Sequence, residues 1–182
     1  MDEKRARFEA EVLPHLDAAY RFARWLSRGP GDAEDVVQEA MLRAFRAFGS
    51  LRGSAPKPWL LAIVKNCHMT ALSQQQRRAF VPLPADDEVQ EEEAALISAQ
   101  ADPEQASLQR DAKRTVDRLL STLSEEYREV LVLREIEELE YREIAAVTNL
   151  PIGTVMSRLA RARAALKACW LRDREANPHA MP

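Results

Sequence analysis

The chain has 182 residues, 46% of them hydrophobic and 30% charged, with five glycines, a composition that favours one or two soluble, mostly helical domains. Its longest uninterrupted apolar run, Trp59 to Val64, is too short to span a bilayer. The charged N-terminus does not resemble a signal peptide, so we expect a cytoplasmic protein without a membrane span.

The formal net charge of −3 is distributed unevenly along the chain. Residues 1–81 contain 13 basic and 9 acidic residues, a net charge of +4, and residues 108–182 contain 13 basic and 12 acidic residues, a net charge of +1. Residues 82–107 contain 8 acidic and no basic residues, and a second concentration of acidic residues extends from Glu125 to Glu143. Because the local distribution of charge governs attraction to phosphate, the negative total does not exclude DNA binding.

Three helices are predicted in an N-terminal domain over residues 1–80. Apolar residues at helical spacing indicate a first helix from about Glu3 to Ser27, with a kink at Pro14 because proline interrupts helical hydrogen bonding. Asp32 is predicted to cap a second helix, which ends near Phe48. After a loop, a third helix is expected to begin near Pro58, since proline suits a first helical turn.

Residues 81–107 are predicted to form a flexible acidic linker, because low complexity, prolines and like charges favour an extended chain. A second helical domain is predicted over residues 108–171, with Ser124 capping one of its helices, and residues 172–182 are predicted to be a disordered tail. The expected fold class is therefore all-α, with two small helical domains joined by the linker.

The segment Leu139–Leu166 has the pattern of a helix-turn-helix. Asn149 tolerates a turn conformation and Pro151 disfavours helical geometry in the residue before it, so the two separate a pair of helices. Val155 would fill the angle between these helices. The second helix, Ile152–Lys167, has no acidic residue and presents Ser, Thr and Arg side chains that suit phosphates and base edges. This segment alone leaves open an ordinary solvated surface helix.

The sequence offers no candidate for catalysis or metal binding. Cys67 and Cys169 match no metal-ligand spacing, and His68 would point away from its neighbour Cys67 on a helix. There is no glycine loop for phosphate and no nucleophile paired with a base. We therefore expect no metal, no cofactor and no enzymatic activity.

Two stretches of the chain, separated by the acidic linker, resemble bacterial sigma factors: DAEDVVQEAMLRAFRAF followed by PWLLAIVKN, and LSEEYREVLVLREIEELEYREIAAVTNLPIGTVMSRLARAR. The short form, with only the second and fourth sigma regions, resembles the extracytoplasmic-function (ECF) group of the sigma-70 superfamily. The resemblance covers residues 8–78 and 115–170. It implies a protein that binds core RNA polymerase and directs promoter-specific transcription initiation by recognising −10 and −35 elements of promoter DNA. Many such proteins are controlled by an anti-sigma factor, which the resemblance adds as a further partner.

The same resemblance implies the residues that make each contact. Core polymerase would be bound by one face of the second helix, through Asp35, Gln38, Glu39 and Leu42. The −10 element, where a base leaves the melting duplex and enters a pocket, would be bound by Ser50, Arg52, Ser54, Lys57, Lys65 and Asn66. The −35 element would be bound by Thr154, Ser157, Arg158, Arg161 and Arg163. Two departures from the family are LSQQQRR, where many members have more arginines, and Met156, where many have a basic residue.

Two other functions are weighed against this one. A sigma-like decoy would sequester an anti-sigma protein without binding DNA, but the basic stretch SRLARAR argues against it. A dimeric helix-turn-helix transcription regulator would explain the C-terminal half and leave DAEDVVQEA and PWLLAIVKN unexplained.

Overall fold

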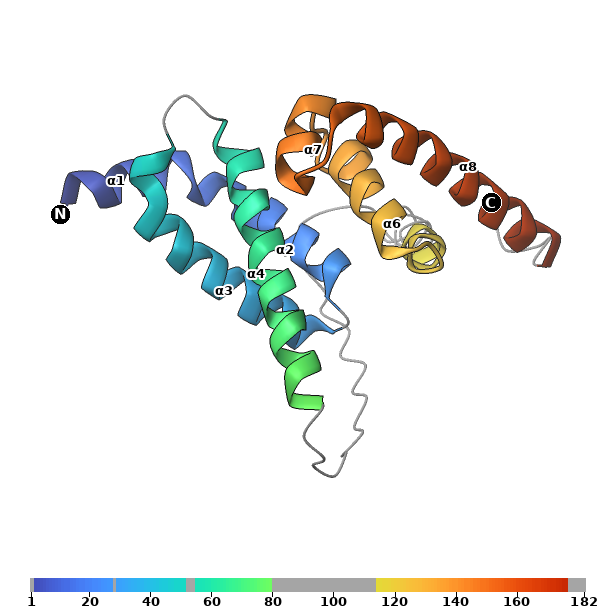
Figure 1. The fold of residues 1–182 in the computed structure, drawn as a ribbon, viewed down its shortest axis with the longest axis horizontal. Coiled ribbons are helices and arrows are strands. Elements are labelled where there is room, and N and C mark those ends of the chain that lie inside the picture. Colours follow the sequence, from blue (N-terminus) through green and yellow to red (C-terminus); the bar gives the residue numbers. More distant parts are fainter. Residues whose placement is uncertain (1, 28, 52–54, 80–113, 177–182) are drawn as a thin grey trace, which may run out of the picture.

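The computed structural model describes residues 2–27, 29–51, 55–79 and 114–176, and every regular element within them is helical, so the all-α prediction is confirmed. Figure 1 shows an N-terminal group of helices, α1 to α4, and a C-terminal group, α6 to α8. None of the described helices combines the length and apolar content that a bilayer crossing requires. The predicted linker, Arg52 and Ser54 lie outside the described residues.

The N-terminal group packs around a core formed mainly by Phe22, Leu60, Leu61 and Val64. α2 contacts both α3 and α4, and α3 and α4 also contact each other. The elements, in chain order, are α1 (Asp2–Glu11), the 3-10 turn η1 (Leu13–His15), α2 (Leu16–Leu26), α3 (Pro30–Ala47), the 3-10 turn η2 (Phe48–Ser50) and α4 (Pro56–Ala79). The predicted kink at Pro14 is confirmed, since η1 separates α1 from α2.

One predicted helix start in this half is wrong by a short distance. α3 begins at Pro30 with Gly29 as its N-cap, and Asp32 is an exposed first-turn residue rather than the cap. Proline at the first helical position is preorganised for a helix, which explains the earlier start. α4 begins at Pro56, so Pro58 lies in its first turn, as predicted.

The C-terminal group begins with a helical stretch over residues 114–121. It continues with α6 (Glu125–Leu131), the π-helical turn η3 (Val132–Ile136), α7 (Tyr141–Thr148) and α8 (Ile152–Ala176). Ser124 is the N-cap of α6, as predicted, but only its backbone takes part: its side chain forms no capping hydrogen bond, and its carbonyl accepts from the backbone of Tyr127 and Arg128. α8 extends to Ala176, so the prediction of a disordered tail from residue 172 is wrong for residues 172–176.

The helix-turn-helix is formed by α7 and α8. Asn149 ends α7 in the left-handed conformation, with φ of 55°, and its backbone N–H donates to the carbonyl of Ala145. Glu140 and Glu143 form a capping box at the start of α7. Val155, which the sequence predicted to fill the angle between these helices, is fully buried.

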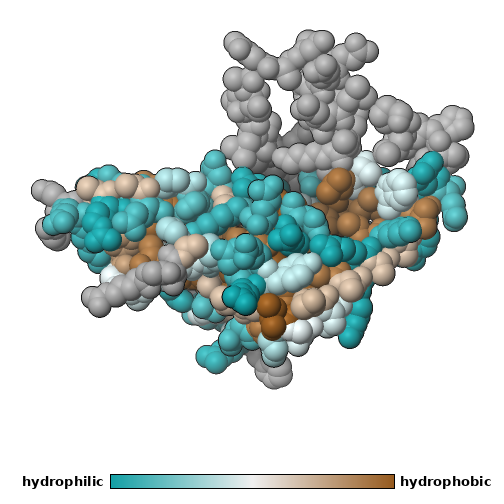
Figure 2. All heavy atoms as spheres, turned by 90° about the horizontal axis from the view of Figure 1, so that it is seen from above, coloured by the Kyte–Doolittle hydropathy of each residue, from teal (hydrophilic) through white to brown (hydrophobic). Residues whose placement is uncertain are grey.

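The two groups of helices lie against each other. Figure 1 shows α4 beside α7, and these two helices are in contact, as are α2 and α6. Buried apolar residues of both groups form one continuous cluster. The face of the molecule in Figure 2 is mostly hydrophilic, with hydrophobic side chains exposed only in small patches. α4, which carries the predicted −10 residues Lys57, Lys65 and Asn66, therefore lies at an interface within the chain.

Candidate nucleic-acid interface

The outer face of α3 is exposed. Asp35, Gln38 and Leu42 lie along it at helical spacing, and Leu42 retains 54% of its accessible surface. Glu39 is half-buried beside them and accepts a hydrogen bond of 2.6 Å from Nε of Arg43. This face thus combines carboxylates, an amide and an exposed leucine, which suits a partner helix with basic and apolar groups.

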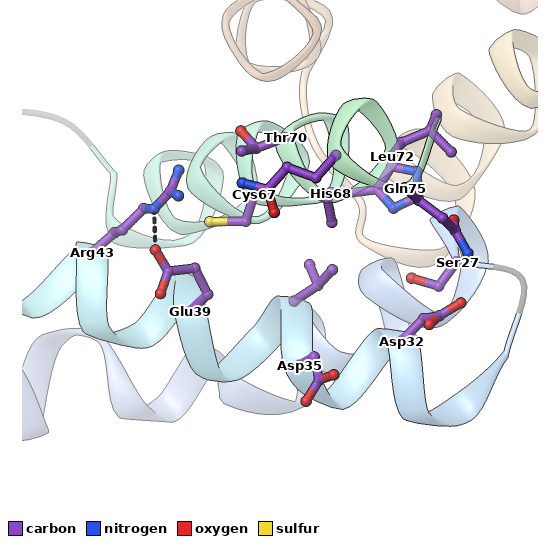
Figure 3. A pocket seen from close by; sticks show the side chains of 13 residues that line it. Ser27, Asp32, Asp35, Glu39, Arg43, Cys67, His68, Thr70, Leu72 and Gln75 are labelled. Atoms are coloured by element: carbon purple, nitrogen blue, oxygen red, sulfur yellow. Dashed lines mark hydrogen bonds and ion pairs between the residues drawn. The ribbon is translucent and has the colours of Figure 1, made fainter. Parts of the chain in front are cut away.

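A groove of about 500 Å³ lies between α3 and α4. Figure 3 shows Glu39 and Arg43 of α3 facing Cys67 of α4 across it, with His68 further along the same helix. Burial raises the pKa of the Cys67 thiol, and the nearby Arg43 only partly opposes this. Cys67 is therefore a neutral thiol near pH 7 and is not an activated nucleophile.

The predicted −10 residues near the start of α4 lie in different environments. Ser50 is exposed, and its hydroxyl donates a hydrogen bond of 2.7 Å to the carbonyl of Ala47. Asn66 is exposed on α4. Trp59 is half-buried against the core, which fits a structural role better than a platform for base stacking.

Lys57 and Lys65, the two predicted −10 lysines, are both held by the C-terminal half. Nζ of Lys57 lies 3.0 Å from Oε2 of Glu137 and donates to the backbone carbonyl of the same residue at 2.7 Å. Nζ of Lys65 lies 2.7 Å from Oε1 of Glu129 and donates to the carbonyl of Thr148 at 3.2 Å. Both side chains are largely covered, with 28% and 19% of their surface exposed.

Glu137 is the most deeply buried charged residue among those described, at 1% exposure. Arg21 of α2 binds it through two parallel contacts, Nε to Oε1 at 3.0 Å and Nη2 to Oε2 at 3.1 Å, so two cations from the N-terminal half face one carboxylate. The backbone presents Glu137 through an irregular turn, in which its N–H donates to the carbonyl of Val132 and the next residue, Glu138, has a φ of 56°. π-turns of this kind are frequent at functional positions.

Glu129 is also buried, and this burial raises the pKa of its carboxyl, although the hydrogen bond and charge of Lys65 and the charge of Arg158 lower it in part. Sequence analysis did not single out Glu129, Glu137 or Arg21. The signal available was the concentration of acidic residues over Glu125–Glu143, which contains both carboxylates. Which basic residues they face is a matter of tertiary structure, which no local pattern specifies.

On α8, four of the five predicted −35 residues share one face. Arg158 follows Thr154 by four residues and precedes Arg161 by three, and Ser157 lies three residues after Thr154 and four before Arg161, so all four lie on one helical stripe. Ser157 donates to the carbonyl of Thr154 at 3.1 Å, and Arg158 forms an ion pair of 3.1 Å with Glu126 of α6. Arg161 is exposed.

Arg163 lies on the opposite side of α8 from this stripe. It binds Glu135 through Nε at 3.0 Å and Nη2 at 2.7 Å, and this hydrogen bonding raises its pKa. It also borders a mostly apolar groove of about 600 Å³. The other residues of this groove are Val116, Leu119, Leu131, Glu135, Leu166, Lys167 and Trp170. Met156 is 52% exposed on α8, beyond the four-residue stripe.

Within the described ranges, no three His, Cys, Asp or Glu side chains are arranged to hold a metal ion. The candidate interface therefore consists of an exposed face on α3, lysines on α4 that are covered by acidic residues, and a polar stripe on α8.

Comparison with known proteins places the two helical groups in two sequence families. Residues 12–78 match the family described as Sigma-70 region 2, and residues 113–166 match Sigma-70, region 4. The chain is 39% identical over 141 residues to the ECF RNA polymerase sigma-E factor of Escherichia coli K12, covering 75% of this chain and 72% of that protein. It is 39% identical over 142 residues to the RNA polymerase sigma-H factor of Pseudomonas aeruginosa, covering 74% of this chain and 71% of that protein.

Solved structures are similar over nearly the whole chain. The sigma factor RpoE of Bartonella quintana, in complex with the anti-sigma factor NepR, superposes with a TM-score of 0.67 and 27% identity, covering 92% of this chain and 99% of that one. CnrH, in complex with the cytosolic domain of CnrY, has the same fold, with a TM-score of 0.59 and 24% identity, covering 93% of this chain and 90% of that one.

Proposed function

Because the chain belongs to the ECF group of sigma factors, which bind core RNA polymerase and direct it to promoters, we propose which residues of this chain make each contact. The family assignment rests on the two sigma regions in their usual order and on relatives of 39% identity. The observation that carries the residue assignment is that the exposed face of α3, the lysines of α4 and the polar stripe of α8 belong to three separate helices.

Polymerase binds the outer face of α3. Asp35 and Gln38 would contact basic and polar groups of a partner helix. Leu42 would enter an apolar depression between those groups of the partner. Leu42 supports this assignment, because a leucine with 54% exposure among polar neighbours gains most from being covered by a partner. Glu39 contributes through its pairing with Arg43, which keeps both side chains at the edge of this face.

The −10 element binds at the start of α4 and at the turn before it. Ser50, Lys57, Lys65 and Asn66 are the described residues of this set, and the predicted Arg52 and Ser54 complete it. Lysines suit a melted strand because they attract phosphate without requiring a particular base. Lys57 and Lys65 can take this part only after leaving Glu137 and Glu129.

The −35 element binds the stripe of Thr154, Ser157, Arg158 and Arg161 on α8, the recognition helix of the helix-turn-helix. The basic side chains reach phosphates or base edges, and Arg can bind guanine through two hydrogen bonds. Arg163 would reach DNA only by leaving Glu135, so we assign it a phosphate contact at most.

The remaining expectations complete the proposal. The protein acts in the cytoplasm beside polymerase and has no catalytic chemistry of its own, since its sites are binding surfaces. An anti-sigma factor controls it; the support is the solved relative in complex with one. The domain boundaries proposed from the sequence, 1–80 and 108–171, enclose the two matched regions. The second proposed domain ends at residue 171, whereas α8 continues to Ala176.

In vitro transcription tests this function. Purified protein and bacterial core polymerase are incubated with a fragmented genomic library, and the transcript starts are sequenced. We expect discrete starts that share two upstream elements, absent when polymerase is used alone. No starts from a folded protein and a competent polymerase would contradict the proposal and favour the decoy.

A further inference from the structure

The side of α8 that faces away from the protein carries small side chains. α6 and α7 both pack against α8 (Figure 1), and the buried side of the helix consists of Val155, Leu159 and Ala162. At about 100° of rotation per residue, the opposite side consists of four exposed residues, Gly153, Ser157, Ala160 and Ala164. These side chains are short, so the backbone of α8 can come close to a partner along this row.

Met156 borders this row of small residues. It retains 52% of its accessible surface and lies outside the core cluster, to which the buried side of α8 belongs. The packing of α8 on its neighbours therefore does not depend on the Met156 side chain. An exposed apolar side chain gains free energy when a partner covers it. Met156 is thus an unpaired apolar group at the edge of the helix face that the small residues leave accessible.

Basic residues follow both edges of the row. Arg158 and Arg161 lie along one edge, and Arg163 and Lys167 lie along the other, beyond Met156. Phosphates border the major groove on both sides, so cations at both edges of the helix suit a position inside the groove. Met156 precedes all of these cations in the chain and lies near the start of α8. The N-terminal residues of a recognition helix are the ones that reach base edges.

The chemistry of the Met156 side chain limits which base it can select. A thioether donates no hydrogen bond, and its sulfur is a weak acceptor. Over adenine, guanine or cytosine it would cover polar groups without replacing their hydrogen bonds to water, which costs free energy. Thymine instead presents its C5-methyl group in the major groove, and apolar side chains pack on that methyl. The flexible methionine side chain can adjust to its position.

We propose that Met156 is a specificity-determining residue of the −35 interface, and that it selects a thymine by packing on its C5-methyl group. The inference rests on the proposed function, which assigns α8 to the −35 element. It divides the contacts of this helix into two kinds. The arginines attract phosphates or guanine through charge, whereas Met156 discriminates at one base pair through an uncharged contact.

Deoxyuridine tests this contact directly, because it pairs with adenine as thymine does and lacks only the methyl group. The full-length chain is bound to core polymerase and titrated with labelled duplexes of a promoter mapped by transcription. In these duplexes each thymine of the −35 element, on either strand, is replaced in turn by deoxyuridine. Fluorescence anisotropy reports the affinity of the complex for each duplex.

We expect one replacement to weaken binding by the wild-type complex about fourfold, the effect of burying roughly one methyl group. Met156→Ala should bind the thymine and deoxyuridine duplexes of that position equally well. Leu171→Ala is the matched control, because Leu171 is a 45% exposed apolar residue near the other end of α8. It should keep the fourfold ratio of the wild type. Circular dichroism should show the same melting temperature for both variants, since alanine favours a helix at exposed positions.

The ratio of the two affinities separates base selection from a structural role. If Met156 only supported the fold, Met156→Ala would weaken binding to both duplexes alike and retain the fourfold ratio, which would overturn the proposal. It would equally be overturned if no deoxyuridine replacement in the −35 element weakened binding by the wild type. Failure of the proposed function is distinguishable, because it would remove the transcription starts. Failure of this inference alone would leave the starts and their dependence on Arg158 and Arg161.

Discussion

The outer face of α3 and the lysine-bearing face of α4 belong to one helical group but differ in what covers them. On α3, Leu42 is 54% exposed, and the nearby Asp35 and Gln38 are exposed as well. On α4, Lys57 and Lys65 are held by buried carboxylates of that half. The face of α3 can bind a partner directly, whereas the lysines of α4 must first leave the carboxylates of the C-terminal half.

The difference teaches how a single small domain can separate two binding events. A surface leucine flanked by polar groups needs no rearrangement before association. A lysine paired with a buried carboxylate must leave that carboxylate before it can bind a phosphate. The free energy needed to break the pair therefore reduces its affinity for DNA. Substitutions on the exposed face of α3 or on the lysine-bearing face of α4 can test this difference.

The largest effect is expected on α3. Gln38→Ala combined with Leu42→Ala should weaken core polymerase binding by about 2 kcal/mol, or roughly thirtyfold, because an exposed leucine buried by a partner has the properties of a binding hot spot. The measurement is a titration of labelled protein with core polymerase.

The control for this experiment is Met69→Ala combined with Gln76→Ala, which truncates the same kinds of side chain at exposed positions of α4. It should leave affinity unchanged. Equal affinity for the α3 variant and the wild type would show that polymerase docks elsewhere.

A smaller effect is expected on α8. Arg158→Ala combined with Arg161→Ala should reduce −35-dependent transcription about tenfold, because the contacts of Arg158 with DNA are partly offset by leaving Glu126. Polymerase binding should be intact. The readout is transcript yield from a mapped promoter.

Arg172→Ala combined with Arg174→Ala is the matched control at the far end of the same helix, where both arginines are exposed. Its yield should equal that of the wild type. Unchanged yield from the Arg158 and Arg161 variant would remove the assignment of the recognition stripe.

The smallest effect concerns His68, which lies on α4 beside the groove. Burial lowers its pKa below the ordinary value of 6.5, although Glu125 and Asp32 oppose this. The unfolded chain therefore takes up the proton more readily than the folded one, so His68 reduces the free energy of unfolding as pH falls through 6.5.

Urea unfolding of the wild type and of His68→Gln at pH 7.5 and 5.5 checks this sign. The wild type should lose more stability on acidification than the variant does. An equal loss in both proteins would mean that His68 does not contribute to the pH dependence.

Much of the fold could be predicted from local sequence. The spacing of apolar residues located the helices, Pro14 located the kink, and Asn149 with Pro151 located the turn of the helix-turn-helix. The errors lie at helix ends. Both Pro30 and Asp32 are favourable start signals for α3, and they lie only two residues apart. Local sequence does not separate two helix starts that lie so close together.

The covering of the candidate site could not be predicted in the same way. Lys57 and Glu137 are 80 residues apart, and Lys65 and Glu129 are separated by 64. A lysine that faces DNA and a lysine that faces a carboxylate have the same local pattern. The basic character of α4 was visible in the sequence, but the partner of each charge is determined only when the two helical groups pack.

The most direct test compares two equilibria of the wild-type protein. Labelled promoter duplex is titrated with the free protein and, separately, with the protein saturated by core polymerase, while binding to polymerase itself is measured under the same salt conditions. We predict tight polymerase binding by the free protein, no duplex binding at those concentrations, and duplex binding once polymerase is present. Tight binding of the duplex by the free protein alone would contradict the account, because it would show that the surfaces for DNA are already open.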